Sequence, residues 1–295
     1  MNAVADRLRV WREALLLPGE TDLLASGVRE LSEFYGISRE EALERARNGV
    51  RASREAWNAA PRRTGEEIVA FYDQCEDYVF EHVHWHSTLT EGETLANVAI
   101  LEYARAAGVR RYLDLGGGVG ANLILFARAG MEVADADVSG PMMAFAKWRL
   151  ERRGLRADFY DLKKGPLPRG RFDLLTAVDV LEHVSDPVAT LGGALPSLVP
   201  GGRALVAMGF GRDPERPMHL VHTPRTFLSG VRGLGLERES PSQLADFPFL
   251  RAYRRVERGR VGNLLVRARD TLVEGARGMG RFAATMVRKT RGAAS

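Results

Sequence analysis

The chain has 295 residues, of which 45% are hydrophobic and 27% charged, and its 42 Lys and Arg against 38 Asp and Glu give a net charge of +4. This composition excludes an intrinsically disordered chain, and a single cysteine excludes an internal disulfide framework. Residues 1–17 lack the apolar run of a signal peptide, and no segment approaches the roughly 20 apolar residues of a transmembrane helix, so we expect a soluble, cytoplasmic protein.

The first 107 residues are predicted to be helical. Helices are expected over 3–16, 21–35, 38–58, 65–86 and 92–107. The spacing of a capping box, in which a hydroxyl residue precedes a glutamate by three positions, occurs at Ser38 with Glu41, Thr64 with Glu67 and Thr90 with Glu93. We expect residues 1–107 to form an N-terminal helical cap that takes part in substrate binding.

After Gly108, short apolar runs alternate with helical stretches, which is typical of a parallel sheet with crossover helices. Strands are expected over 111–115, 132–137, 156–160, 172–178 and 203–208, and helices over 119–130, 141–153 and 187–198. A helix opening at Thr223-Pro224 and an antiparallel hairpin of 236–239 with 249–256 complete the pattern. The prediction for residues 108–258 is an α/β fold with a doubly wound, mainly parallel seven-stranded sheet.

A glycine-rich loop, Gly116-Gly117-Gly118-Val119-Gly120, follows the first expected strand. Glycines let a backbone turn sharply and approach a nucleotide closely at the edge of such a sheet. Asp137 lies 21 residues after Gly116, the spacing of a carboxylate that binds ribose hydroxyls. The loop also matches the dinucleotide fingerprint through Gly116, Gly118 and Ala121, so by itself it leaves a dehydrogenase open.

Four segments in this order resemble the class I S-adenosylmethionine-dependent methyltransferases, over roughly residues 110–255. They are Asp114-x-Gly116-x-Gly118-x-Gly120, the run Val133–Ser139, the strand Phe172–Leu175 leading to Val180-Leu181-Glu182-His183-Val184, and the turn Leu198-Val199-Pro200-Gly201-Gly202. The resemblance implies an enzyme with S-adenosylmethionine as its cofactor. The cofactor-binding residues that it implies are Asp114, Gly116, Gly117, Gly118 and Gly120 for the methionine end, Asp137 and Val138 for the ribose, Asp161 for the adenine amine, and Asp179.

Methyl transfer is an in-line displacement, so the protein positions the acceptor and, where needed, removes its proton. Glu182 and His183 follow the fourth expected strand, and His219 follows the fifth, so all three are candidate catalytic residues at one edge of the sheet. His183 is the first candidate base because an imidazole titrates near neutral pH. The alternative is that the Leu-Glu-His run only packs around the cofactor.

Five of the six histidines cluster in two short segments, at 82, 84 and 86 and at 219 and 222. The first segment ends a helix rich in aromatic residues, which in the methyltransferases it resembles folds over the cofactor as a lid. The candidate substrate-binding residues are Tyr72, Trp85, His86 and His222.

His82 and His86 share a helix face, and Cys75 lies on nearly the same face two turns earlier, so a metal-assisted enzyme completed by His219 or His222 is an alternative. No established metal-binding spacing is present, however, and we expect no metal.

Residues 28–45 resemble a helix-turn-helix, which raises the alternative of a cofactor-binding regulatory protein that binds DNA without turnover. The second helix of this segment begins Arg39-Glu40-Glu41 and contains Glu44, and carboxylates repel phosphates. We therefore expect a helical cap and no nucleic-acid partner.

The end of the chain is basic, with a net charge of +9 over residues 251–295 and −5 over the first 250. Residues 259–295 are predicted to form a basic amphipathic tail. Its apolar stripe comprises Val261, Leu265, Ala268, Leu272, Ala276, Met279, Ala283 and Met286, with Arg277, Arg281 and Arg288 opposite. This helix is expected to dock on the body or form a homodimer, or to make peripheral membrane contact.

Together these patterns predict an S-adenosylmethionine-dependent methyltransferase acting on a small molecule, with oxygen, nitrogen and carbon acceptors all open.

Overall fold

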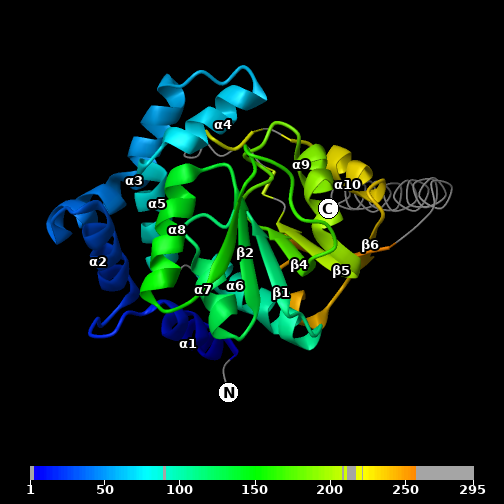
Figure 1. Cartoon of the computed structure of the whole chain (residues 1–295), viewed down its shortest axis with the longest axis horizontal. Helices are drawn as coiled ribbons and strands as arrows, with labels where there is room; N and C mark the ends of the chain where they lie inside the picture. The colour runs from blue at the N-terminus through cyan, green and yellow to red at the C-terminus, as the bar shows by residue number, and fades with distance from the viewer. Residues whose placement is uncertain (1–2, 89–90, 208, 211–216, 221, 257–295) are drawn as a thin grey trace, which may run out of the picture.

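A seven-stranded sheet forms the centre of the protein (Figure 1). The computed structural model describes residues 3–88, 91–207, 209–210, 217–220 and 222–256. Its strands are β1 (Arg111–Leu115), β2 (Glu132–Asp137), β3 (Ala157–Asp161), β4 (Phe172–Ala177), β5 (Leu198–Ala207), β6 (Leu236–Glu239) and β7 (Leu250–Arg255), in the order β3-β2-β1-β4-β5-β7-β6. Strand β7 runs antiparallel to both of its neighbours, β5 and β6, and the other four strand pairs are parallel, so the doubly wound, mainly parallel sheet is confirmed.

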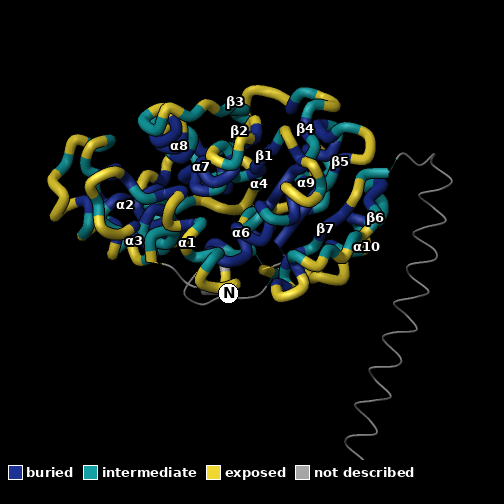
Figure 2. Tube along the Cα trace, turned by 90° about the horizontal axis from the view of Figure 1, so that it is seen from below, coloured by how far each residue is buried: buried dark blue, intermediate teal, exposed yellow. Residues whose placement is uncertain are grey.

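Helices cover both faces of the sheet. They are α1 (Ala3–Leu15), α2 (Leu23–Tyr35), α3 (Arg39–Ala59), α4 (Gly65–Gln74), α5 (Asp77–Ser87), α6 (Glu91–Ala106), α7 (Ala121–Arg128), α8 (Gly140–Arg152), α9 (Pro187–Ala194) and α10 (Pro224–Arg232). Ile100 of α6 and Ile124 of α7 share one core cluster with Tyr112 of β1, whereas Leu191 of α9 and Phe227 of α10 belong to the cluster on the other face. Figure 2 shows the buried residues along the central strands between these layers.

A third core cluster joins the cap helices α2, α3 and α5 to α8. Val28 and Leu31 of α2, Ala42 of α3 and Phe80 of α5 pack in one cluster with Phe145 of α8. The segment that resembles a helix-turn-helix therefore uses its apolar positions to build the cap. Figure 1 shows α2–α5 gathered on one side of the sheet.

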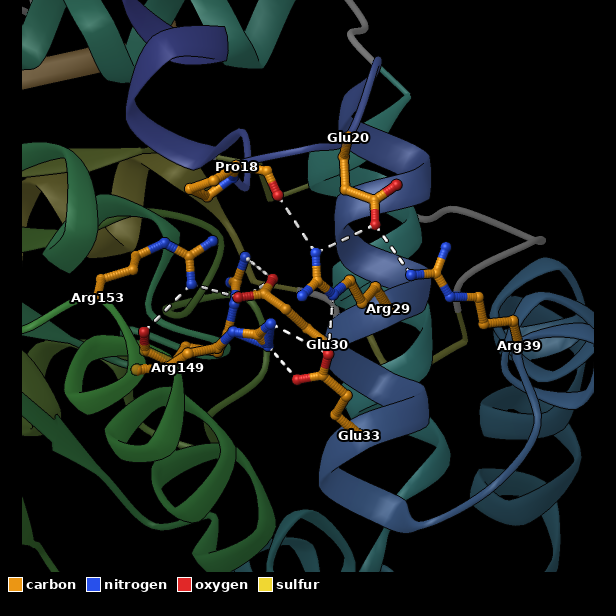
Figure 3. A network of polar contacts seen from close by, with 9 residues as sticks. Pro18, Glu20, Arg29, Glu30, Glu33, Arg39, Arg149 and Arg153 are labelled. Carbon is orange, nitrogen blue, oxygen red and sulfur yellow. Dashed lines mark hydrogen bonds and ion pairs between the residues drawn. The ribbon is translucent and has the colours of Figure 1, made fainter.

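Buried ion pairs connect α2 of this cap to α8, a helix that packs on the sheet (Figure 3). Glu30 of α2 is fully buried and accepts a hydrogen bond from Nε of Arg149 on α8 at 3.0 Å, and it also pairs with Arg153. Nη1 of Arg149 donates to the carbonyl oxygen of Val119 in the glycine loop at 2.8 Å. The position of the cap is thus coupled through two side chains to the backbone of that loop.

The expected helix over 65–86 is wrong, because the structure has two helices separated at Cys75 and Glu76. Thr64 and Glu67 form the complete capping box that starts α4, and Cys75 ends it in a non-helical conformation (φ −84°, ψ 89°). Cys75 is buried in an apolar cluster with Trp57 and Phe71, and this packing accompanies the break. The prediction that Cys75 shares a helix face with His82 and His86 is therefore also wrong.

Two other boundaries differ from the sequence prediction by more than two residues. The helix expected over 187–198 ends at Ala194 and continues as a short 3-10 turn, Leu195–Ser197, that contains Pro196. Strand β5 begins at Leu198 because this residue already pairs with Phe172 of β4, five residues before the expected start.

Several sequence predictions fall outside the described residues, namely Thr90 and the whole tail over 259–295. No helix in the described part of the chain is long and apolar enough to span a bilayer. The division at residue 107 stays a prediction. Helices α1 and α6, which precede this boundary, share their core cluster with the sheet.

Candidate functional site

The glycine loop closes the carboxyl end of β1 and opens α7. Gly116, Gly118 and Gly120 have φ values of 72°, 54° and 75°, in the left-handed region that favours glycine. The amide of Gly116 donates to the carbonyl oxygen of Ala136 at 2.8 Å, which holds the loop against β2. A Cβ on Gly116 would lie 2.5 Å from Cγ2 of Val180, so the loop also needs glycine for lack of space.

Three carboxylates lie at the ends of β1 and β2 beside this loop. Asp114 is buried and accepts a hydrogen bond from Oγ1 of Thr176 at 2.6 Å. Asp135 is its register partner on β2, is fully buried, and accepts from the amide of Gly117 at 2.9 Å. Asp137 ends β2 and accepts from the amides of Val138 and Ser139 at 2.6 and 2.9 Å.

Burial raises the pKa of all three carboxyl groups. For Asp114, desolvation outweighs the hydrogen bonds that favour the ionised form and raises the pKa to about 6. Desolvation, with repulsion from the other two carboxylates, raises the pKa of Asp135 well above its usual range. Burial also raises the pKa of Asp137 despite the two amides that donate to it. Such a site favours a cationic ligand, because a nearby positive charge stabilises the ionised carboxylates.

Helix α5 covers a crevice that lies next to the glycine loop. Tyr78, His82, Trp85 and His86 line it from one helix face, and a Cβ on Gly118 would lie 3.2 Å from Nδ1 of His82. The crevice has an inner compartment, lined among others by Trp85, His86, Asn97, Asp114, Asn122 and His219. Its outer compartment is lined among others by Tyr72, Asp137, Val138, Met142, Val180 and Val184. Both compartments contact Tyr78, His82, Gly116, Gly118, Asp179 and His183.

His183 stands where the two compartments meet. Its Nδ1 lies 2.9 Å from the hydroxyl of Tyr72 on α4, and its ring is perpendicular to that of His219, with the ring centroids 4.8 Å apart. Asp179, which also lines both compartments, has φ 53°, the one non-glycine residue with positive φ in the part of the chain that the structure describes. Strained backbone of this kind is often found at functional sites.

Four predicted site residues lie elsewhere. Glu182 is 1% exposed and belongs to neither compartment, and Gly120 packs against Ala146 of α8. Asp161 ends β3 beside Asp137 and forms ion pairs with Lys163 and Lys164 at 3.5 and 3.2 Å. Nε2 of His222 donates to the carbonyl oxygen of Val184 at 2.8 Å, outside the lining.

The alternative of a metal centre finds no support in the geometry. Among the residues that the structure describes, no group of three or more His, Cys, Asp or Glu side chains is arranged to hold a metal ion. His82 and His86 stack with ring centroids 6.0 Å apart, and Cys75 lines a different hollow.

The sequence analysis missed four polar residues of the site: Glu81, Asn97, Asn122 and Asp135. Glu81, Asn97 and Asn122 line the inner compartment, and Asp135 supports the glycine loop. Asn97 and Asn122 interrupt otherwise apolar stretches of α6 and α7, and a lone polar residue on the buried side of a helix is a signal for such a role.

The residues present fit S-adenosylmethionine. Asp137 offers a carboxylate at the end of β2 for ribose hydroxyls, and Gly116 and Gly118 of the glycine loop line both compartments. The raised pKa of Asp114 and Asp135 suits a cofactor that carries a sulfonium and an ammonium group.

Comparison with known proteins agrees with this geometry. Residues 113–206 match the family model described as a methyltransferase domain. The chain is 35% identical over 150 residues to a demethylmenaquinone methyltransferase of Thermus thermophilus, covering 47% of this chain and 68% of the relative. It is 37% identical over 98 residues to a ubiquinone biosynthesis O-methyltransferase of a Bradyrhizobium species, of which the match covers only 39%.

Among solved structures, phosphoethanolamine N-methyltransferase 2 of Haemonchus contortus, in complex with S-adenosylmethionine, superposes with a TM-score of 0.51. The match covers 64% of this chain and 60% of that one, and at 16% identity it shows the fold alone. From the family match, the Thermus relative and the glycine loop with its carboxylates, we conclude that the chain belongs to the class I S-adenosylmethionine-dependent methyltransferases and uses S-adenosylmethionine as its cofactor.

Proposed function

We propose that the protein transfers the methyl group of S-adenosylmethionine to a hydroxyl of a small, uncharged aromatic molecule bound under α4 and α5. When bound, the cofactor supplies an electrophilic methyl group on a sulfonium. The observation that carries the proposal is that His183, which lines both compartments of the crevice, contacts Tyr72 of the outer compartment and His219 of the inner one.

The lining supports an uncharged aromatic acceptor. Tyr72, Tyr78 and Trp85 offer aromatic surfaces, and Glu81 and Asp179 contribute carboxylates. Among the described residues, neither compartment is lined by a Lys or Arg, the side chains that recognise phosphates and carboxylates. Anionic acceptors and nucleic acids are therefore disfavoured. The two named relatives act, by their names, in ubiquinone biosynthesis and on demethylmenaquinone.

His183 acts in this proposal as the general base. Burial raises the pKa of Tyr72 well above its usual range, so its hydroxyl stays protonated at neutral pH and can accept a hydrogen bond from Nδ1 of His183. That arrangement places the basic lone pair on Nε2, which takes the proton of the acceptor hydroxyl. The deprotonated hydroxyl oxygen would then face the electrophilic methyl group that the bound cofactor would supply, and Tyr72 would hold the His183 ring in orientation.

The test is a substrate series with methyl-labelled S-adenosylmethionine. Neutral phenols and catechols are compared with matched compounds that carry a carboxylate or phosphate, and with aromatic amines. We expect label in the neutral phenols and at least tenfold lower turnover with the anionic compounds. Preferred labelling of amines or anionic compounds contradicts the proposed acceptor, and tight cofactor binding without any labelled product favours a regulatory protein.

The homodimer, the peripheral membrane contact and the role of the basic tail stay predictions, since the tail lies outside the described residues.

A further inference from the structure

Three polar side chains meet at the inner end of the crevice, one from each of three successive helices. His86 of α5, Asn97 of α6 and Asn122 of α7 all line the inner compartment, next to Asp114. Each has a buried polar atom that finds no hydrogen-bond partner in the described part of the chain: Nδ1 of His86, and Oδ1 of Asn97 and of Asn122. Leaving one such atom unsatisfied costs about 1–3 kcal/mol, so three in one compartment indicate a site built for a polar ligand group.

The two asparagines are fixed in place by their surroundings. Asn97 is 8% exposed and lies between Ala96 and Val98, which belong to the core cluster of α6. The side chain of Asn122 forms a hydrogen bond with Asp114 that favours the ionised carboxylate, so its amide nitrogen donates and its oxygen is left over. Asn97 is therefore held at the compartment by the packing of α6, and Asn122 by its hydrogen bond to Asp114.

His86 contributes a neutral ring. Burial, with repulsion from His82 and Arg149, lowers the pKa of His86 to about 3, so the imidazole is uncharged at neutral pH. Its main-chain carbonyl accepts from Nε1 of Trp11 at 3.2 Å, which helps to fix this turn of α5. A neutral imidazole offers one acceptor and one donor nitrogen.

Two side-chain amides, a neutral imidazole and a carboxylate supply both donors and acceptors and are joined by no Lys or Arg among the described lining residues. This chemistry suits a zwitterion, whose ammonium needs several acceptors and whose carboxylate needs donors. Asp137, the predicted ribose ligand, lies in the other compartment. We propose that His86, Asn97 and Asn122 bind the α-amino-acid end of S-adenosylmethionine, so that the cap and α6 take a direct part in cofactor recognition.

The proposal concerns the cofactor alone and is independent of which acceptor is methylated. It is tested by titration calorimetry with two ligands, S-adenosylhomocysteine and 5′-methylthioadenosine, which shares the nucleoside but lacks the amino-acid end. For Asn97→Ala, Asn122→Ala and His86→Ala we expect the affinity for S-adenosylhomocysteine to fall by about 10- to 100-fold, as for lost hydrogen bonds to a charged group. The affinity for 5′-methylthioadenosine should change by less than about twofold.

Two controls separate this role from a structural one. Asp137→Ala should weaken the binding of both ligands, and Asn58→Ala, at an exposed position on α3, should weaken neither. Equal losses for the two ligands in the three variants, or no loss for either, would overturn the proposal.

A measurement on the unaltered chain covers the case in which a variant fails to fold. The ring ¹⁵N resonances of His86 should shift when S-adenosylhomocysteine binds and stay in place when 5′-methylthioadenosine binds. Identical shifts with both ligands contradict the assignment.

Discussion

The hydroxyl of Tyr72 and Nδ1 of His183 lie 2.9 Å apart although 111 positions separate them in the sequence. This hydrogen bond joins α4 of the cap to the loop that follows β4, across the outer compartment. It places a base candidate from the sheet and an aromatic residue from the cap in one unit. The catalytic arrangement that we propose therefore exists only when α4 lies against the loop that follows β4.

Substitutions in this pair should affect turnover more than cofactor binding. We expect His183→Ala to lower kcat by about 10² to 10⁴, the usual contribution of a general base. Tyr72→Phe should lower it about tenfold, the effect of one hydrogen bond. His84→Ala is the matched control, because His84 lies on α5 but lines neither compartment. Steady-state kinetics with labelled cofactor measure kcat and KM for each variant. Unchanged turnover in His183→Ala would show that the protein acts only by positioning the acceptor and the cofactor, without a general base.

Cofactor affinity should depend on pH through Asp114. The pKa of this carboxyl is about 6 in the free protein because of its burial, and a bound cation should lower it. Binding then releases a proton, so affinity should rise with pH by up to about tenfold per unit until pH 6 and level off above it. Titration calorimetry from pH 4.5 to 8 measures cofactor affinity as a function of pH. In Asp114→Asn we expect weaker cofactor binding and an affinity that changes less with pH. If affinity changes as steeply with pH in this variant, the titrating group is not Asp114.

Gly116 and Gly170 provide a matched pair for testing the glycine loop. Both have positive φ, 72° and 59°, so alanine at either position costs about 1–2 kcal/mol of backbone strain. A Cβ on Gly116 would also meet Val180 at 2.5 Å, whereas nothing lies within 4 Å at Gly170. We expect Gly116→Ala to weaken cofactor binding at least tenfold and Gly170→Ala to leave it unchanged. Adding Val180→Ala to Gly116→Ala should restore part of the affinity, and no recovery would argue against the steric explanation.

Glu30 should stabilise the fold in a pH-dependent way. Burial alone would raise the pKa of this carboxyl, but Arg149 and Arg153 outweigh it and the net shift is downward. The stabilisation is therefore complete above the unfolded-state pKa near 4.5 and is lost as the pH falls below it. Glu30→Gln leaves two arginines without their buried partner and should cost about 3–5 kcal/mol of unfolding free energy.

Glu33→Gln is the comparison for Glu30, because Glu33 pairs with Arg29 and Arg152 near the surface. Such pairs contribute about 0–1 kcal/mol. Urea unfolding of both variants between pH 3 and 7 measures the difference, and equal losses would show that burial of the Glu30 pair adds nothing. Since Arg149 also holds the carbonyl of Val119, Glu30→Gln should raise KM for the cofactor more than it lowers kcat.

The local pattern of the sequence was enough to predict the sheet and its cofactor loop. The apolar runs of β1 and β2, the glycines after β1 and Asp137 at the end of β2 all lie within one βαβ unit, and their spacing follows from the geometry of that unit. The cofactor class did not follow from this unit alone, which leaves a dehydrogenase open, but from the resemblance of four segments over roughly residues 110–255 to a known family.

Only the tertiary structure decided which polar residues share the crevice. Nothing in the sequence shows that His86, Asn97 and Asn122 line one compartment, or that Glu182 and His222 do not. At the break between α4 and α5, Cys75 likewise packs in an apolar cluster with Met218, 143 residues later in the chain, a neighbour that the local sequence does not show. Helix and strand periodicity tells which face of an element is buried, but the neighbour of that face is set by the packing of distant segments, and the site is made of such neighbours.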